Sequence, residues 1–341
     1  MVQLVPFKVD PLSFHELIVQ PMFGDVIDSE TGSVIRPSME EGDWNLVDSP
    51  KHSVPIIDVF GRNNLIKRKD STCKLIYSQV GKLGSRKIEH EDLYAATEDC
   101  VDEFYQGSFK DWSTQNFEKF GELVMPIMEK GVAADIYTNK YFGDISRASD
   151  STGVISWNKF NGIWPKYLGY VTSNVLAAPI AIPAGAITPS AANTLLDSMY
   201  AGQDGIMENY DDEEKCFYVD KDIYDAYGDY LLTMNAGALS LQELQAGRAK
   251  LYKRGIEVKW KKWGGVLKAL NNGTKAHAAI LTLRGNFLYK TDSTYGGGPN
   301  RNEAVRIWWS DDDGVWKRQI HFCGGTDIAA PQHSVLAITS L

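Results

Sequence analysis

The most regular hydrophobic pattern in the chain runs from Lys275 to Asp292. Ile280 and Thr282 point to one side of a predicted strand, because side chains alternate between the two faces of a strand. The residues that point to the other side are Ala279, Leu281 and Leu283. A turn at residues 284–286 follows, with a glycine and an asparagine that tolerate positive φ. The pattern resumes at residues 287–291 and so predicts two strands, joined at a turn, in a sheet buried on both faces.

The rest of the second half of the chain carries alternating strand and helix patterns, typical of an α/β or α+β lobe. The predicted strands are Lys215–Asp220, Ile256–Trp260, Ala304–Trp309, Val315–Phe322 and Ser334–Ile338. The predicted helices are Pro189–Met199, with Thr188 or Ser190 near its cap, and Ile223–Leu232. An aspartate-glycine turn at residues 311–314 joins two of these strands in a hairpin. Asn158–Gly169 is aromatic and rich in turn residues.

A long amphipathic helix is predicted from Ser113 or Thr114, either of which can cap it, to Phe142. Its apolar residues recur at three- and four-residue steps and are Phe117, Phe120, Val124, Ile127, Met128, Ile136, Tyr137 and Tyr141. Such a helix would be about 40 Å long at about 1.5 Å per residue, more than one compact domain normally needs. Pro126 should bend it. The alternative is an ordinary core helix broken at Pro126. Because late strands must pair with earlier segments, we expect the helix and the C-terminal hairpin to form one domain.

Residues 53–95 predict a long two-stranded hairpin, with Val54–Phe60 and Lys74–Ser78 as its strands. Between Phe60 and Lys87 the chain has eight basic residues and one acid, Asp70. The basic residues are Arg62, Lys67, Arg68, Lys69, Lys74, Lys82, Arg86 and Lys87. An isolated two-stranded ribbon is marginally stable in water, so a long one is expected to lie on a partner surface.

Acidic residues elsewhere in the chain could supply that surface in a second copy. The first group is Glu98, Asp99, Asp102 and Glu103, and the second is Asp211, Asp212, Glu213 and Glu214. The alternative is that each charged run is a solvated face, where an ion pair contributes under about 1 kcal/mol.

The first 50 residues contain five prolines and two glycine-bearing turns, with no sustained helical period. This predicts an extended arm that lies on another surface, or alternatively a wrap around its own domain.

The composition limits the classes of function that this chain can have. The chain has 341 residues, 43% of them hydrophobic, and a net charge of -9. It is long enough to bury a core, either in two compact lobes or in one lobe with long extensions, and its acidity argues against a surface whose main role is to bind nucleic acid. No secretory signal is recognisable, and two prolines interrupt the most apolar run, Val175–Ile187, so no membrane span is expected.

The chemistry of known catalytic and metal sites is missing from the sequence. His15-Glu16 and His90-Glu91 begin a metalloprotease motif, but Val19 and Tyr94 stand where the second histidine is required. The four cysteines are widely spaced, which favours free thiols. No phosphate loop or nucleophile elbow is present, so we expect no catalytic residue, no metal and no cofactor.

Four segments in the right order resemble the major capsid proteins of tailed bacteriophages. They are Ala133–Ile136 with Tyr141–Asp144, Cys216–Val219 with Asp222–Tyr227, Leu251–Val258, and Ala279–Asp292. With the chain that follows, they cover residues 133–341, about two thirds of the sequence. Arg284 departs from the family, in which a turn proline or aspartate is commoner, and the N-terminal third carries no recognised motif.

The resemblance implies the α+β fold of tailed-phage major capsid proteins. Its expected parts are an N-terminal arm (1–50), an extended hairpin loop (51–95), a peripheral domain with the long spine helix (96–157), an axial domain (158–300), a peripheral hairpin (301–330) and a return strand to the axial domain (331–341). The resemblance then leads us to expect twelve charged residues at subunit contacts. They are the eight basic residues of the hairpin loop and the four residues of the first acidic group.

The implied function is structural. Copies would form hexamers and pentamers that close into an icosahedral virion shell around double-stranded DNA, after assembly in the bacterial cytoplasm. Expected partners are other copies, portal and scaffolding proteins, auxiliary capsid proteins and non-specifically contacted DNA, without a membrane. Two alternatives stay open, an encapsulin-like compartment that encloses cargo enzymes and a soluble α+β enzyme.

Overall fold

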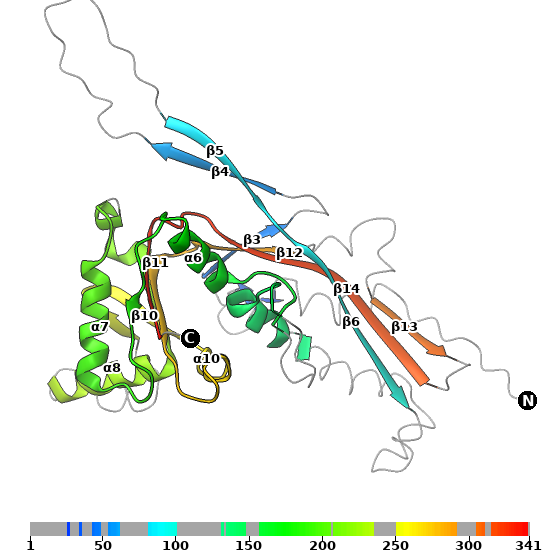
Figure 1. Ribbon diagram of the computed structural model, residues 1–341. Helices are drawn as coiled ribbons and strands as arrows, with labels where there is room; N and C mark the ends of the chain where they lie inside the picture. The colour runs from blue at the N-terminus through cyan, green and yellow to red at the C-terminus, as the bar shows by residue number, and fades with distance from the viewer. Residues whose placement is uncertain are drawn as a thin grey trace, which may run out of the picture.

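The computed structural model describes residues 26–27, 34–35, 43–48, 54–61, 81–100, 131–132, 134–147, 157–205, 207–234, 250–291, 305–310 and 315–339. These residues form two sheets, a two-stranded ribbon and the helices that pack on them (Figure 1). The chain passes from one sheet to the other through short connections between strands, not through a long linker. Side chains of both sheets, among them Ile280 and Phe287, belong to one hydrophobic cluster, so the two sheets share a core.

The first sheet has six strands in the order β7-β15-β11-β8-β10-β9. Their bounds are β7 Ile180–Ala181, β15 Ser334–Ile338, β11 Ala278–Leu283, β8 Lys215–Asp220, β10 Ile256–Lys261 and β9 Leu251–Lys253. β8 pairs in parallel with β10 and antiparallel with β11, so the sheet is mixed. The strands predicted at residues 215–220, 256–260 and 334–338 are confirmed.

Helices cover both faces of the six-stranded sheet. α7 (Pro189–Ala201) and α8 (Lys221–Met234) pack on one face with Ala279 and Leu281 of β11. α6 (Ile163–Thr172), α10 (Gly264–Leu270) and the helical residues 134–142 pack on the other face with Ile280. Figure 1 shows these two groups on opposite sides of β10 and β11. The alternation in β11 therefore arises because both faces of a central strand are buried.

The helix predictions are confirmed where the structure describes them. Thr188 caps α7, since its hydroxyl accepts a hydrogen bond of 3.3 Å from the Ala191 amide. The predicted long helix ends at Phe142 as expected, and residues 131–132 and 134–142 are helical. Its first half, with Pro126, lies outside the described residues. α6 corrects the turn-rich interpretation of Asn158–Gly169, and Pro165 fits its first turn, where a missing N–H costs little.

The second sheet has five strands. β13 (Val305–Ser310), β14 (Val315–Ile328), β12 (Phe287–Thr291) and β3 (Trp44–Asp48) follow in that order, and β6 (Glu91–Cys100) pairs along the free side of β14. The predicted C-terminal hairpin is confirmed, because β13 and β14 pair antiparallel from Ser310 and Val315 outward. β14 pairs with β6, so late strands do pair with an earlier segment.

The segment 287–291 does not form a hairpin with β11. β12 lies in the second sheet and β11 in the first, so the chain changes sheets at residues 284–286. Gly285 has φ of +69°, which confirms the positive φ expected there. Alternating side chains show which face a strand presents but not which strand is its neighbour, which explains the difference.

The predicted hairpin loop is a two-stranded ribbon of β4 (Val54–Gly61) and β5 (Gly81–Ile88). The partner of β4 is therefore β5 and not Lys74–Ser78, which lies outside the described residues. In Figure 1 the ribbon extends away from both sheets. Near the N-terminus, β1 (Val26–Ile27) pairs with β2 (Val34–Ile35). β3 pairs in parallel with β12, so this part of the predicted arm wraps its own domain.

Candidate subunit interface

The ribbon carries the predicted basic residues that the structure describes. Lys82, Arg86 and Lys87 lie on β5 and pair in register with Phe60, Ile56 and Pro55 of β4. The other basic candidates, Arg62, Lys67, Arg68, Lys69 and Lys74, lie outside the described residues.

The predicted acidic residues lie at the far end of the following strand. Glu98 on β6 is exposed and pairs in register with Lys317, and Asp99 pairs with Trp316. Asp102 and Glu103 lie outside the described residues. At about 3.3 Å per residue, the sixteen steps along the chain from Lys82 to Glu98 span about 50 Å, and Figure 1 shows β6 running away from the ribbon. The basic and acidic groups of one copy are thus too far apart to pair with each other.

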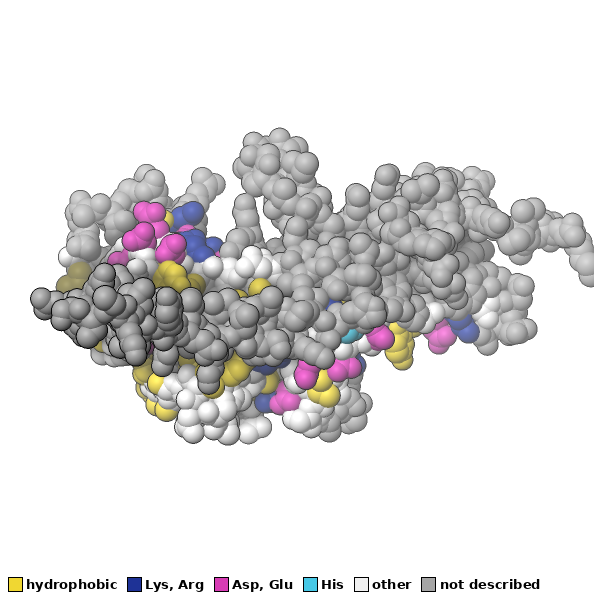
Figure 2. Space-filling model, turned by 90° about the horizontal axis from the view of Figure 1, so that it is seen from above, with side chains coloured by type: hydrophobic (Ala, Val, Ile, Leu, Met, Phe, Trp, Pro, Cys, Tyr) yellow, Lys and Arg dark blue, Asp and Glu magenta, His cyan; other side chains and the backbone are white. Residues whose placement is uncertain are grey.

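The outer face of β6 also carries the most exposed large apolar side chain that the described residues contain. Leu93 and Ala95 pack against the core, so Asp92, Tyr94 and Glu98 point the other way. Tyr94 is 70% exposed. In Figure 2, acidic side chains and a protruding hydrophobic side chain lie close together along the lower right edge, where the strands of the second sheet run. We call Asp92, Tyr94 and Glu98 the β6 outer face.

The base of the ribbon is held by close backbone contact. Glu89 and His90 join β5 to β6 and cross Gly325 of β14, where a Cβ would lie 2.2 Å from the Glu89 carbonyl oxygen. The buried Lys290 ammonium donates to Nδ1 of His90 at 3.0 Å. Glycine at position 325 therefore allows the ribbon to leave the second sheet at this point.

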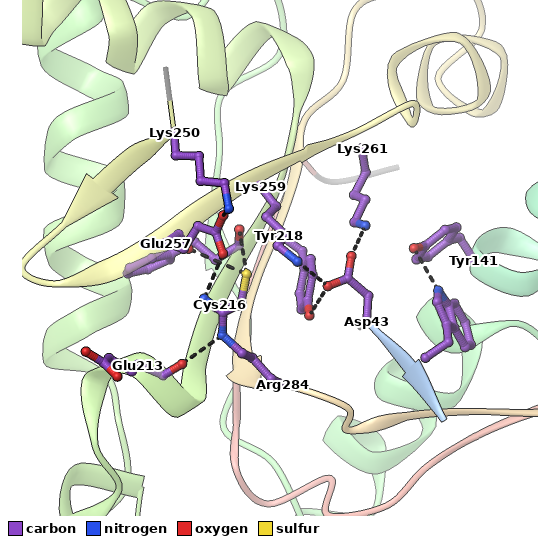
Figure 3. A network of polar contacts seen from close by, with 12 residues as sticks. Asp43, Tyr141, Glu213, Cys216, Tyr218, Lys250, Glu257, Lys259, Lys261 and Arg284 are labelled. Carbon is purple, nitrogen blue, oxygen red and sulfur yellow. Dashed lines mark hydrogen bonds and ion pairs between the residues drawn. The ribbon is translucent and has the colours of Figure 1, made fainter. Parts of the chain in front are cut away.

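A buried ionic cluster fastens β3 to the first sheet (Figure 3). The Asp43 carboxylate accepts hydrogen bonds from Lys259 at 2.8 Å, from Lys261 at 2.5 Å and from the Tyr218 hydroxyl at 3.0 Å. Burial alone would raise the pKa of Asp43, but the two lysines outweigh it and the pKa lies below its ordinary value. Burial raises the pKa of Tyr218, so its hydroxyl keeps its proton and donates. Residue 43 therefore joins the N-terminal segment to β8 and β10.

The second acidic group has local partners. Asp211 and Glu214 form a capping box around the short helix η3 (Asp212–Glu214), and Asp212 lies 3.2 Å from the buried Lys215 ammonium. The Glu213 carbonyl accepts a hydrogen bond of 2.7 Å from Arg284. These contacts give the second acidic group a structural role within the chain.

Arg284 explains the departure of this turn from the family pattern. Its guanidinium also lies 2.7 Å from the Glu257 carboxylate, and its amide donates to the Glu214 carbonyl. Arginine at this position joins the sheet-changing turn to η3 and to β10. Sequence reasoning missed this role because the partners are 27 and 71 residues away.

A second buried polar pair lies at the same end of the first sheet, because Asp220 of β8 is in register with Lys261 of β10. Nδ1 of His277 is 3.1 Å from the Asp220 carboxylate, and Nε2 is 2.7 Å from the Gly185 carbonyl oxygen. A ring that carries a proton on each nitrogen can donate to both of these acceptors. Burial alone would lower the pKa of His277, but Asp220 and Gly185 outweigh it and raise it above the ordinary value. Asp220 also accepts the amides of Ile223 and Ala278, so the pair fixes the start of α8 and of β11.

The described residues contain no set of three histidine, cysteine or acidic side chains that could hold a metal ion. Within the same part of the chain, no helix is long and apolar enough to cross a membrane. Burial raises the pKa of the Cys216 thiol to about 12, which keeps it protonated and a poor nucleophile.

No protein-family model and no curated protein matches the chain. Solved structures do match it. A chain of the satellite phage P4 procapsid that includes the size determination protein Sid superposes with a TM-score of 0.52 and 10% identity, over 86% of this chain and 92% of its own. The mature capsid of bacteriophage PhiM1 gives 0.49 and 10%, over 88% and 86%. The holo-SrpI encapsulin complex of Synechococcus elongatus PCC 7942 gives 0.45 and 10%, over 97% and 95%.

The fold is assigned from the P4 procapsid chain, because the similarity extends over most of both chains. This chain has the phage capsid fold. The predicted fold class and the resemblance read from the sequence are confirmed. The segments that carried the resemblance lie in β8, α8, β9, β10, β11, β12 and the end of the helix at Phe142.

Proposed function

We propose that this chain is the major capsid protein of a tailed bacteriophage, a structural protein without a catalytic role. Copies assemble as hexamers and pentamers into an icosahedral shell around double-stranded DNA, in the cytoplasm of the bacterial host. The observation that supports this best is the similarity to the P4 procapsid chain over 92% of that chain. Many modest contacts per subunit become effectively permanent when they are repeated under closed symmetry.

The ribbon of one copy contacts the acidic surface of its neighbour in this proposal. A two-stranded ribbon that extends from its own body lacks the second layer that stable sheets need. The proposed contact residues are Arg62, Lys67, Arg68, Lys69, Lys74, Lys82, Arg86 and Lys87 on the ribbon, and Glu98, Asp99, Asp102 and Glu103 on the neighbour. Tyr94 fits the role of a central anchor, because exposed aromatic residues are enriched at interface cores.

Sedimentation velocity with negative-stain microscopy tests assembly directly. Wild-type protein should form capsomer rings or shells, and Lys82→Glu with Arg86→Glu should leave it as smaller species. Lys262→Glu with Lys268→Glu reverses two exposed lysines, one just after β10 and one in α10, and is the charge-matched control. Assembly that the ribbon reversal leaves unchanged would remove the ribbon from the interface.

Charge exchange tests the neighbour's surface. Asp92→Lys with Glu98→Lys should also block assembly, and combining it with the ribbon reversal should restore it, because opposite charges again face each other. Failure of the combination to restore assembly would place the acceptor surface elsewhere.

Nuclease treatment distinguishes the phage shell from the encapsulin-like compartment. Particles purified from cells that express the whole phage should protect double-stranded DNA, and a compartment should carry protein cargo instead. Portal, scaffolding and auxiliary proteins are the further partners of the proposed shell. Copurification of these proteins with the precursor particles checks that part of the proposal.

A further inference from the structure

Two strand connections pass from one sheet to the other, and they lie side by side. β11 continues into β12 through residues 284–286, and β14 continues into β15 through residues 329–333. β12 pairs with the end of β14, and β11 pairs with β15, so both strands keep their neighbour as they cross. In Figure 1 the two crossings lie between the helical lobe and the long strands. A change of the angle between the sheets must bend both connections together.

One side chain joins the two connections. The Asn286 amide oxygen accepts a hydrogen bond of 2.7 Å from the Ala330 amide, and its NH₂ group donates to the Ala330 carbonyl at 3.1 Å. The Asn286 carbonyl also accepts from the Ala329 amide at 2.9 Å. Asn286 is 4% exposed. An asparagine amide is one of the few side chains that offers an acceptor and donors in this paired arrangement.

Buried hydroxyls extend this contact into the first sheet. The Asn286 NH₂ group donates to the Thr282 hydroxyl at 2.7 Å. Thr282 lies 2.9 Å from the Ser334 hydroxyl, which in turn lies 2.8 Å from the Tyr167 hydroxyl of α6. All three hydroxyls are buried. We call Thr282, Asn286, Ala330 and Ser334 the Asn286 clasp.

The clasp is not the only contact between the sheets, because the Asp43 cluster also joins the start of β3 to the first sheet, and other side chains contact the turn itself. Gly285 is at positive φ and has no side chain, so the turn itself is a site of low stiffness. Asn45 of β3 donates to the Gly285 carbonyl at 2.5 Å from the second sheet, and Arg284 contacts Glu257 in the first. The turn is therefore held from both sheets, and the clasp is where the two connections contact each other.

We propose that Asn286 is a positioning residue that fixes the angle between the six-stranded and five-stranded sheets. Aspartate has the same shape but cannot donate, and its charge would face the Ala330 carbonyl. Without the paired hydrogen bonds, the two connections bend independently and the sheets sample a range of angles. Packed interfaces have discrete arrangements, so loss of the bonds should populate a second angle.

The clasp also bears on assembly, and this part rests on the proposed function. The ribbon leaves the second sheet, while α7 and α8 cover the first, so the angle between the sheets sets how neighbouring copies meet. A subunit with a variable angle would not repeat one contact under closed symmetry. Asn286→Asp shells should then vary in diameter, whereas wild-type shells should be uniform.

Pulsed electron-electron resonance distances test the clasp without assembly. Spin labels go on Tyr252→Cys in β9 and Ala96→Cys in β6, both exposed sites, with Cys73 and Cys100 replaced by serine and excess unlabelled protein present. The remaining cysteines, Cys216 and Cys323, are buried. Asn209→Asp is the matched control, because Asn209 is exposed and its amide donates only to Gly205 within its own turn.

The label distances should form one narrow distribution in the labelled parent and in the Asn209→Asp protein. Asn286→Asp should widen that distribution about twofold or add a second peak. A lowered Tm with an unchanged distance distribution would show a merely structural role and overturn the proposal.

If Asn286→Asp does not fold, Thr282→Val removes one acceptor and keeps the shape, and it must widen the same distribution. The distance distribution could widen in Asn286→Asp while the wild-type protein never assembles. That outcome would contradict the proposed function but still support the role proposed for Asn286.

Discussion

Buried charges at Asp43 and His277 hold segments that are far apart in the sequence. Asp43 joins β3 to β10 across 218 residues, and His277 joins β11 to the end of β8 across 57. Neither contact could be predicted from the sequence, because the partners follow no local spacing. The sequence does show lysines at every second position near the end of β10. This was the one available indication that the strand contacts an acidic residue.

Asp43→Asn should lower the free energy of unfolding by about 3 to 5 kcal/mol, because it leaves Lys259 and Lys261 without their carboxylate. Urea denaturation followed by tryptophan fluorescence measures it. Asp222→Asn is the control, since the Asp222–Lys275 pair is exposed and its loss should change the free energy of unfolding little. Equal effects of the two substitutions would show that the Asp43 cluster is not a buried structural contact.

The His277–Asp220 pair gives stability a defined pH dependence. The pKa of His277 is raised in the folded chain, so the pair stabilises fully below the unfolded value near 6.5 and is lost as the pH rises through the folded value. The free energy of unfolding should fall over that window by up to about 1.4 kcal/mol per pH unit. His277→Gln should flatten this slope and His333→Gln should keep it. A slope that survives in His277→Gln would assign it to another group.

At the scale of elements, patterns that depend on neighbours in sequence were predicted well. β8 and β15 match the predicted strands, because both lie inside the first sheet and carry continuous apolar side chains. α6 was missed because Pro165 and Gly169 suggest turns, yet the helix buries Ile163, Trp164 and Tyr167. β5 was missed because two glycines interrupt its pattern, and only pairing with β4 shows it to be a strand.

The close crossing at the base of the ribbon depends on Gly325. Gly325→Ala should cost about 1 to 3 kcal/mol, because the new Cβ would meet the Glu89 carbonyl and the His90 Cα, which are backbone atoms that cannot rotate away. Thermal unfolding monitored by circular dichroism measures the loss. Gly169→Ala adds a methyl group to open space in α6 and should raise stability by about 0.5 to 1 kcal/mol. An unchanged Tm in Gly325→Ala would mean that the ribbon base is not in close contact with β14.

At the scale of the whole molecule, the sequence indicated the fold through four ordered segments, and the P4 procapsid similarity agrees. The sequence could not show how the two sheets are joined, since the turn at Gly285 resembles a hairpin turn locally. It also could not place the charged surfaces. The structure puts Lys82 of β5 and Glu98 of β6 far apart along the chain, and in the proposed function a second copy brings such charges together.

Electron cryomicroscopy of the particles that the purified protein forms tests the central claim most directly. The account predicts a closed icosahedral shell in which the β4–β5 ribbon of each copy lies on the β6 outer face of a neighbour. A protein that stays monomeric at every concentration, or a shell in which each ribbon packs on its own chain, would contradict it.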